Sequence, residues 1–160
     1  MSTATAILDA QHDSIVQAFA DALDTMGFMF ADLAEEVPAV PDEAVRIRMH
    51  FRASIHTDLA GIFEMNASRT FAALLTANVL GCDPIDLDDE AINDCAKELI
   101  NVAVGAFTPL LSDDPDETFT LTPPSYETIG EEDWQEALFA EGTVSLISEG
   151  EPVVVRVIVE

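Results

Sequence analysis

Residues 45–52 alternate strictly between apolar and polar side chains. The apolar set is Val45, Ile47, Met49 and Phe51, and the polar set is Arg46, Arg48, His50 and Arg52. A period of two places the two sets on opposite faces of a β-strand. The chain is therefore expected to contain a sheet with one apolar face to cover, and the three arginines of this strand are expected to point outward.

Four further segments are predicted to add strands to this sheet. A turn at residues 56–58 leads into a second strand through residues 61–63, which predicts a hairpin. Residues 119–121 form a short strand that ends at Pro123-Pro124. Two runs rich in β-branched residues, 142–148 and 153–159, predict a closing hairpin. The result is a mainly antiparallel sheet of about five or six strands.

Two amphipathic helices are predicted before the middle of the chain. The first is capped by Asp13 and ends near Gly27, while residues 28–30 fit either a continued helix or the start of a strand. The second is capped by Asn66 or Ser68 and ends at Gly81. With helices packed on one face of the sheet, these elements predict an α+β fold, and 160 residues suffice for a single domain over residues 1–160.

A longer helix begins in the acidic segment 86–90 and runs to about Pro109. One broad side of this helix is apolar and the other is polar. Val102 and Ala106 are expected to lie on the apolar side. The polar side carries a stripe of residues spaced by four, three and four positions. These residues are Asp94, Glu98, Asn101 and Gly105.

Such spacing directs the Asp94, Glu98 and Asn101 side chains from neighbouring turns of one helix face, where they can address one ligand together. Gly105 lies one turn beyond Asn101 and leaves an uncrowded surface that another backbone can approach. This geometry fits a partner protein better than a deep small-molecule pocket. The competing interpretation is an ordinary solvated helix face.

The pattern Asp94-x-x-x-Glu98-x-x-Asn101 followed by Gly105 resembles the signature of the CheC/CheX/FliY chemotaxis phosphatase family, most closely the CheX branch. The resemblance extends over most of the chain, including segments 78–81 and 122–125. It implies a CheC-like fold and a phosphatase that removes the phosphoryl group from a receiver-domain aspartate of a CheY-like response regulator. The alternatives are a receiver-binding module without catalysis and a structural subunit of a signalling assembly.

By this resemblance, Asn101 orients the attacking water and Glu98 pairs with a lysine of the regulator, with Asp94 in a supporting position. The partner receiver supplies Mg²⁺, and the chain needs no cofactor of its own. The resemblance also implies a homodimer joined through the sheets, with strand 46–52 and the closing hairpin as the expected edges. Ala106 stands where many relatives have a second asparagine.

The segment Asp86-x-x-x-Glu90-x-x-Asn93 satisfies the same pattern eight residues earlier. There, the acidic residues are explained by capping and by the helix dipole. The sequence context after the pattern, in which apolar residues lead to Gly105, favours the later copy as the site.

The chain has 6 basic and 31 acidic residues, a net charge of −25, and this charge repels nucleic acid and anionic membrane surfaces. A salt-rich cytoplasm, simple solubility or steering toward a basic partner would each account for it. Cys82 and Cys95 lack metal-type spacing, as do the three histidines, so no metal site is expected. A cytoplasmic location is expected because no secretory signal is evident. Trp134 is expected to pack beneath an acidic loop.

Overall fold

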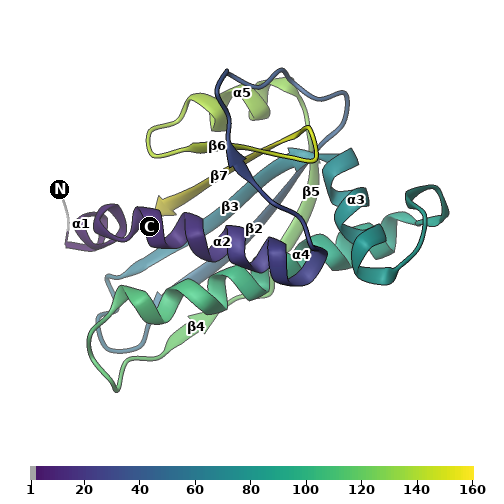
Figure 1. The fold of residues 1–160 in the computed structure, drawn as a ribbon. Coiled ribbons are helices and arrows are strands. Elements are labelled where there is room, and N and C mark those ends of the chain that lie inside the picture. Colours follow the sequence, from purple (N-terminus) through teal and green to yellow (C-terminus); the bar gives the residue numbers. More distant parts are fainter. Residues whose placement is uncertain (1–2) are drawn as a thin grey trace.

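A computed structural model describes residues 3–160 and contains a seven-stranded sheet (Figure 1). The order is β1-β6-β7-β3-β2-β4, with β5 also paired to β2, and every pairing is antiparallel. The strands are β1 (Asp32–Leu33), β2 (Ala44–Ala53), β3 (Ala60–Ser68), β4 (Phe119–Leu121), β5 (Ser125–Ile129), β6 (Val144–Ser148) and β7 (Glu151–Val159). The predicted antiparallel α+β architecture is confirmed, with β1 and β5 as additional strands.

Two long hairpins form the centre of the sheet. The predicted β2–β3 hairpin pairs Ile47 with Met65, and the predicted closing hairpin pairs β6 with β7. The turn between β6 and β7 uses positive φ angles at Glu149 and Gly150, a conformation that suits a two-residue hairpin loop. Strand β3 joins the two hairpins by pairing with β7.

Four helices cover the apolar face of the sheet (Figure 1). They are α1 (Thr3–Ala10), α2 (His12–Gly27), α3 (Arg69–Leu80) and α4 (Asp89–Phe107), with short 3₁₀ segments η1 (Pro84–Asp86) and η2 (Thr108–Leu111) flanking α4. The core between them includes Phe19 of α2, Phe63 of β3 and Phe107 of α4, all within 1% of complete burial. Ring contacts link Phe63 to both other rings, so sheet and helices form one apolar interior.

Some of the predicted helix ends are confirmed by the structure, and others are corrected. Ser68 caps α3 by accepting a hydrogen bond from the Phe71 amide at 3.0 Å, and Gly81 ends that helix in the left-handed conformation, as predicted. Asn66, the other candidate cap, lies inside β3. The cap of α2 is Gln11 rather than Asp13, because α1 precedes it almost directly. Residues 28–30 form neither helix nor strand, and Phe28 adopts a left-handed φ of 53°.

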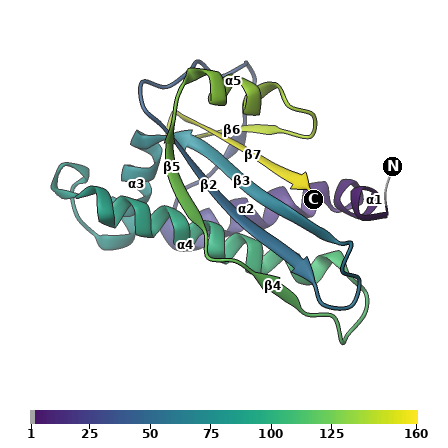
Figure 2. The same cartoon turned by 180° about the vertical axis from the view of Figure 1, so that it is seen from behind.

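The helix α5 (Glu131–Phe139) occupies the segment that the sequence analysis assigned to a loop. It packs at one end of the opposite face of the sheet, as Figure 2 shows. Its Trp134 is completely buried against Ala44, Ile129 and Val154, so the expected packing of this side chain is confirmed, although beneath a helix. Burial of this large ring explains why a short and polar segment holds a helical conformation.

Charged side chains beneath α5 form a buried network. Arg46 points to the sheet face opposite the main core, as expected, but α5 covers this face and removes Arg46 from solvent. The Glu64 carboxylate, which has no exposed surface, accepts hydrogen bonds from Arg48 Nε at 2.6 Å, Arg156 Nε at 2.9 Å and Asn66 Nδ2 at 2.7 Å. Arg46 is only 6% exposed and donates to Asn66 Oδ1. Burial alone would raise the pKa of Glu64, but these three donors outweigh it and lower the pKa.

The expected pairing edge at β2 is wrong, because β2 lies inside the sheet. It pairs with β3 on one side and with β4 and β5 on the other. The closing hairpin is flanked by β3 and by the two-residue strand β1. The outermost strands of the sheet are therefore β1 at one end and β4 with β5 at the other.

Candidate functional site

Helix α4 carries the predicted stripe and is held firmly at its start. The Asp88 carboxylate caps the helix by accepting a hydrogen bond from the Ala91 amide at 2.8 Å. One side of the helix is buried against the sheet and against α2 and α3, with Leu99, Ile100 and Phe107 completely buried. Val102 and Ala106 were expected on that apolar side but are exposed, because they lie at its border.

The four residues of the stripe all lie on the exposed face of α4. At about 100° per residue, Asp94, Glu98, Asn101 and Gly105 fall within about 60° of one another around the helix axis. Within residues 3–160, the side chains of Glu98 and Asn101 make no hydrogen bond or ion pair. A carboxylate and a carboxamide thus stand one turn apart in solvent, with their bonding capacity unused by the chain itself.

Gly105 has no structural role within the described chain. A Cβ atom at this position would meet no heavy atom within 4 Å, and its φ is not in the left-handed region. A glycine inside a helix costs about 0.5–1 kcal/mol relative to alanine. Glycine therefore destabilises the isolated fold at this position. A partner that packs closely against this surface of α4 would explain why the residue has no side chain.

Two hollows flank the stripe. On one side, a groove of about 430 Å³ lies between α2 and α4, and we call it the α2–α4 groove. It is lined by Ser14, Gln17, Ala18, Asp21, Ala22 and Thr25 of α2, by Val102 and Ala106 of α4, and by Leu110 of η2. On the other side, a polar hollow of about 720 Å³ includes Asp94, Arg69 and Tyr126. Arg69 is paired there with Asp89 and Glu43.

The earlier copy of the motif does not form one helical stripe. Asp86 belongs to η1, whereas Glu90 and Asn93 belong to α4, and the capping residue Asp88 separates the two elements. Glu90 and Asn93 line the polar hollow beside Arg69. The structure thus distinguishes the two copies, which the spacing alone did not.

Neither cysteine has the environment of a nucleophile. Burial raises the pKa of the Cys95 thiol, and the nearby Glu98 carboxylate raises it further, so the thiol stays protonated near neutral pH. Cys82 lies exposed after α3 as a free thiol. Residues 3–160 contain no group of three or more histidine, cysteine, aspartate or glutamate side chains arranged to hold a metal ion. No helix in this range combines the length and the apolar character needed to cross a bilayer.

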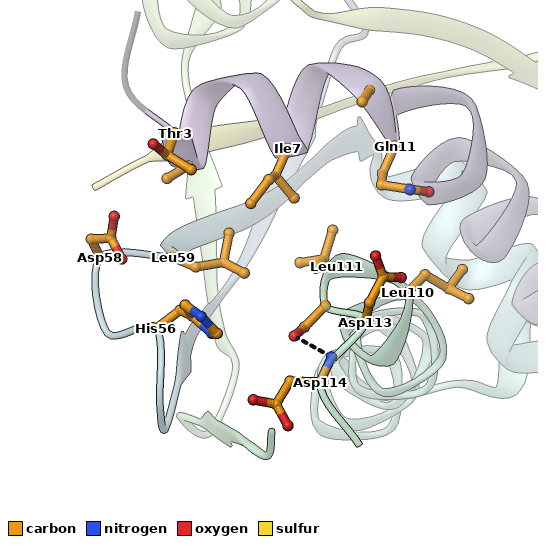
Figure 3. A pocket seen from close by; sticks show the side chains of 13 residues that line it. Thr3, Ile7, Gln11, His56, Asp58, Leu59, Leu110, Leu111, Asp113 and Asp114 are labelled. Carbon is orange, nitrogen blue, oxygen red and sulfur yellow. Dashed lines mark hydrogen bonds between the residues drawn. The ribbon is translucent and has the colours of Figure 1, made fainter. Parts of the chain in front are cut away.

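A separate hollow of about 410 Å³ lies between α1, the β2–β3 turn and η2, and Figure 3 shows Ile7, Leu111 and His56 around it. His56 Nδ1 lies 2.7 Å from Glu117 Oε2, and the same carboxylate accepts a hydrogen bond from the Ile55 amide at 2.6 Å. Burial would raise the pKa of Glu117, but these bonds lower it to about 2. No sequence pattern marks this pair, whose contacts tie the β2–β3 turn to the segment before β4.

No protein-family model matches the sequence, and no curated protein matches it significantly. Solved structures do match the fold. The chemotaxis protein CheX from Desulfovibrio desulfuricans is 16% identical with a TM-score of 0.61, covering 91% of this chain and 96% of that one. The CheX of a CheX–CheY–BeF₃–Mg²⁺ complex from Borrelia burgdorferi is 15% identical with a TM-score of 0.63, covering 91% and 95%.

The chain has the CheX fold. A related match is the FliY protein of Thermotoga maritima, with 13% identity, a TM-score of 0.57, and coverage of 99% of this chain and 91% of that one. The resemblance seen in the sequence is thereby confirmed at the level of the fold, with CheX and FliY proteins as structural neighbours. The roles of Asp94, Glu98, Asn101 and Gly105 stay predictions, since a shared fold does not determine chemistry.

Proposed function

We propose that this CheX-fold protein binds a CheY-like receiver domain through α4 and hydrolyses its aspartyl phosphate. The observation that carries the proposal is the pair of Glu98 and Asn101, which lie exposed one turn apart with no hydrogen bond or ion pair to the rest of the described chain. The CheX–CheY complex of Borrelia burgdorferi supports a receiver as the partner. Gly105, where the helix is open to a close approach, supports the same face of α4.

The proposed reaction is an in-line displacement at phosphorus. Water attacks the phosphoryl group, the bond between phosphorus and the aspartate oxygen breaks, and the products are the free carboxylate and inorganic phosphate. The Asn101 amide accepts from and donates to this water and so orients it, which is the kind of positioning that acyl phosphate hydrolysis needs. Mg²⁺ is expected to come from the receiver and to neutralise charge on the phosphoryl oxygens.

Glu98 is proposed to fix the docking register. Its carboxylate would pair with a lysine in the receiver's active site, a contact formed only when α4 enters that site. Asp94, which is also exposed and lies one turn earlier, would add a second acidic contact at the edge of the interface. Asn101 is thus the proposed catalytic residue, and Glu98 joins binding to catalysis.

The test measures phosphate release from a receiver phosphorylated by acetyl phosphate in the presence of Mg²⁺. The receivers are Borrelia burgdorferi CheY and the receiver domains encoded near the gene for this chain. Asn101→Ala should abolish hydrolysis while keeping complex formation, and Glu98→Ala should weaken both. The earlier motif copy provides matched controls on the same helix, because Asn93→Ala and Glu90→Ala should leave both quantities unchanged.

Each alternative gives a different result in this assay. Binding by the wild type without phosphate release identifies a receiver-binding module. Equal rates for wild type, Asn101→Ala and Glu98→Ala contradict the enzymatic assignment and favour a structural subunit.

We further propose a homodimer, which the resemblance implies, and a cytoplasmic location, which was expected from the sequence. Pairing of two sheets would have to use an outer strand, β1 or β4 with β5, because β2 is internal. A monomeric mass in sedimentation at micromolar concentration would contradict the dimer.

A further inference from the structure

The α2–α4 groove borders the stripe directly and presents an apolar surface to solvent. Val102 follows Asn101 in the sequence and is 37% exposed, and Leu110 at the end of the groove is 51% exposed. Small residues of α2, Ala18 and Ala22, form the opposite wall. Their size leaves a shallow trough between the two helices.

We propose that this groove receives an aliphatic side chain of the same receiver domain whose phosphoryl group Asn101 addresses. The inference rests on the proposed function and adds to it a second contact, which sets the angle at which α4 enters the receiver. Val102, Ala106 and Leu110 are then positioning and specificity residues rather than catalytic ones.

Geometry makes the groove and the stripe one surface. At about 100° per residue, Val102 lies about 40° around the helix from Glu98, and Ala106 lies about 100° from Gly105 on the same flank. A partner surface broad enough to cover Glu98, Asn101 and Gly105 therefore also covers Val102. A standard protein interface of about 800 Å² per partner is much broader than one helical stripe.

The chemistry of the lining selects an aliphatic occupant. The apolar part of the lining carries methyl and methylene groups, including those of Ala18, Val102 and Leu110, and Asp21 is the one charged side chain in the lining. The polar rim lies on α2, where Gln17 Nε2 donates to Asp21 Oδ1 at 2.8 Å and so satisfies part of the rim internally. An apolar group gains from leaving water at the apolar part of the lining, whereas a charged group would lose hydration without a partner there.

The stripe and the groove would have different tasks. Glu98 and Asn101 would contact the phosphorylated active site, which is similar in all receivers. The groove would contact a side chain outside that site. Discrimination between receivers would then depend on the groove, because a missing or enlarged aliphatic group changes how well the trough is filled.

The direct test uses methyl-resolved NMR of the full chain during titration with the BeF₃-activated, Mg²⁺-bound receiver that gives phosphate release above. The methyl signals of Val102 and Leu110 should shift and show contacts to receiver methyl groups. Val79 provides the control, because it is also helical, has a similar exposure of 41%, and lies outside the groove. Unshifted Val102 and Leu110 signals in a saturated complex would overturn the inference.

Variants give the second test. Val102→Asn and Leu110→Asn should each weaken receiver binding about tenfold, since burial of one aliphatic side chain is lost, while Val79→Asn should not change it. Ala106→Phe, which fills the trough without adding polarity, should also weaken binding. Circular dichroism and thermal unfolding establish that each variant is folded.

Two failures are distinguishable in these measurements. If Asn101→Ala abolishes hydrolysis but the groove variants bind and turn over like wild type, the groove inference is wrong and the proposed function stands. If wild type neither binds nor dephosphorylates any receiver tested, the proposed function fails and the groove inference fails with it.

Discussion

Replacing Gly105 by alanine should raise stability and lower activity at once. The added Cβ meets no atom within 4 Å, so it brings no packing gain and no clash within the chain. What remains is the helix propensity difference between glycine and alanine, about 0.5–1 kcal/mol in favour of the variant. For a chain of this length, that corresponds to a rise in melting temperature of about 1–4 °C.

The same methyl group should disturb a partner that approaches α4 closely. An extra methyl in a well-packed contact costs about 1–3 kcal/mol, which is about a 5- to 150-fold loss of affinity. Thermal unfolding measures the first effect, and receiver binding with phosphate release measures the second. A higher melting temperature together with weaker receiver binding is the result expected if this surface contacts another molecule closely.

Gly27→Ala is the contrasting control. A Cβ there would lie 2.6 Å from Leu75 Cδ1 in the buried core, so this variant should lose stability instead of gaining it. If Gly105→Ala is stabilised and keeps wild-type binding and turnover, close approach at this position is refuted. If Gly105→Ala is destabilised, the open environment assigned to the residue is itself incorrect.

Three other substitutions test the fold. Ser68→Ala removes the cap of α3 and should cost about 1 kcal/mol in denaturant unfolding. Glu64→Ala removes the buried carboxylate that accepts from Arg48 and Arg156, leaving Arg156 with Glu136 alone, and should cost up to about 3–5 kcal/mol, a loss that calorimetry would detect as a drop in melting temperature. The pKa of the Glu117 carboxylate is lowered to about 2 in the folded protein. Ionised Glu117 therefore stabilises the fold at pH values above its unfolded pKa, and this stabilisation is lost as the pH falls toward 2. Glu117→Gln should make the stability less dependent on pH in this acidic range. The His56 pKa is raised, so its contribution is present below its unfolded pKa and is lost as pH rises through the folded value.

Strong periodic segments were predictable because their pattern reports which side is buried. The alternation in β2 and the apolar spacing of α4 each require one buried face, and both elements appear close to the predicted limits. Helix α5 was missed because its sequence is mostly polar, yet it carried a usable signal. Three acidic residues open its first turn, and Trp134, Ala137 and Leu138 follow helical spacing.

Some features depend on contacts that no local pattern encodes. Arg46 alternates correctly for an outward-facing residue, but α5 folds over that face and buries it with Glu64. The border of the apolar side of α4 was misplaced for a similar reason, because only the position of α2 determines that Val102 and Ala106 stay in solvent. The exposure of Glu98 and Asn101, in contrast, followed from the helix period alone.

The buried arginine network has an electrical consequence for the whole molecule. Four of the six basic residues, Arg46, Arg48, Arg52 and Arg156, belong to the sheet face opposite α4. Arg48, Arg52 and Arg156 are paired there with Glu64, Glu136 and Glu160, so the helical side keeps only Arg69 and Lys97 to balance its own carboxylates. The negative field on the helical side is therefore largely uncompensated at close range, and its effect on an approaching molecule should weaken once salt shortens the Debye length.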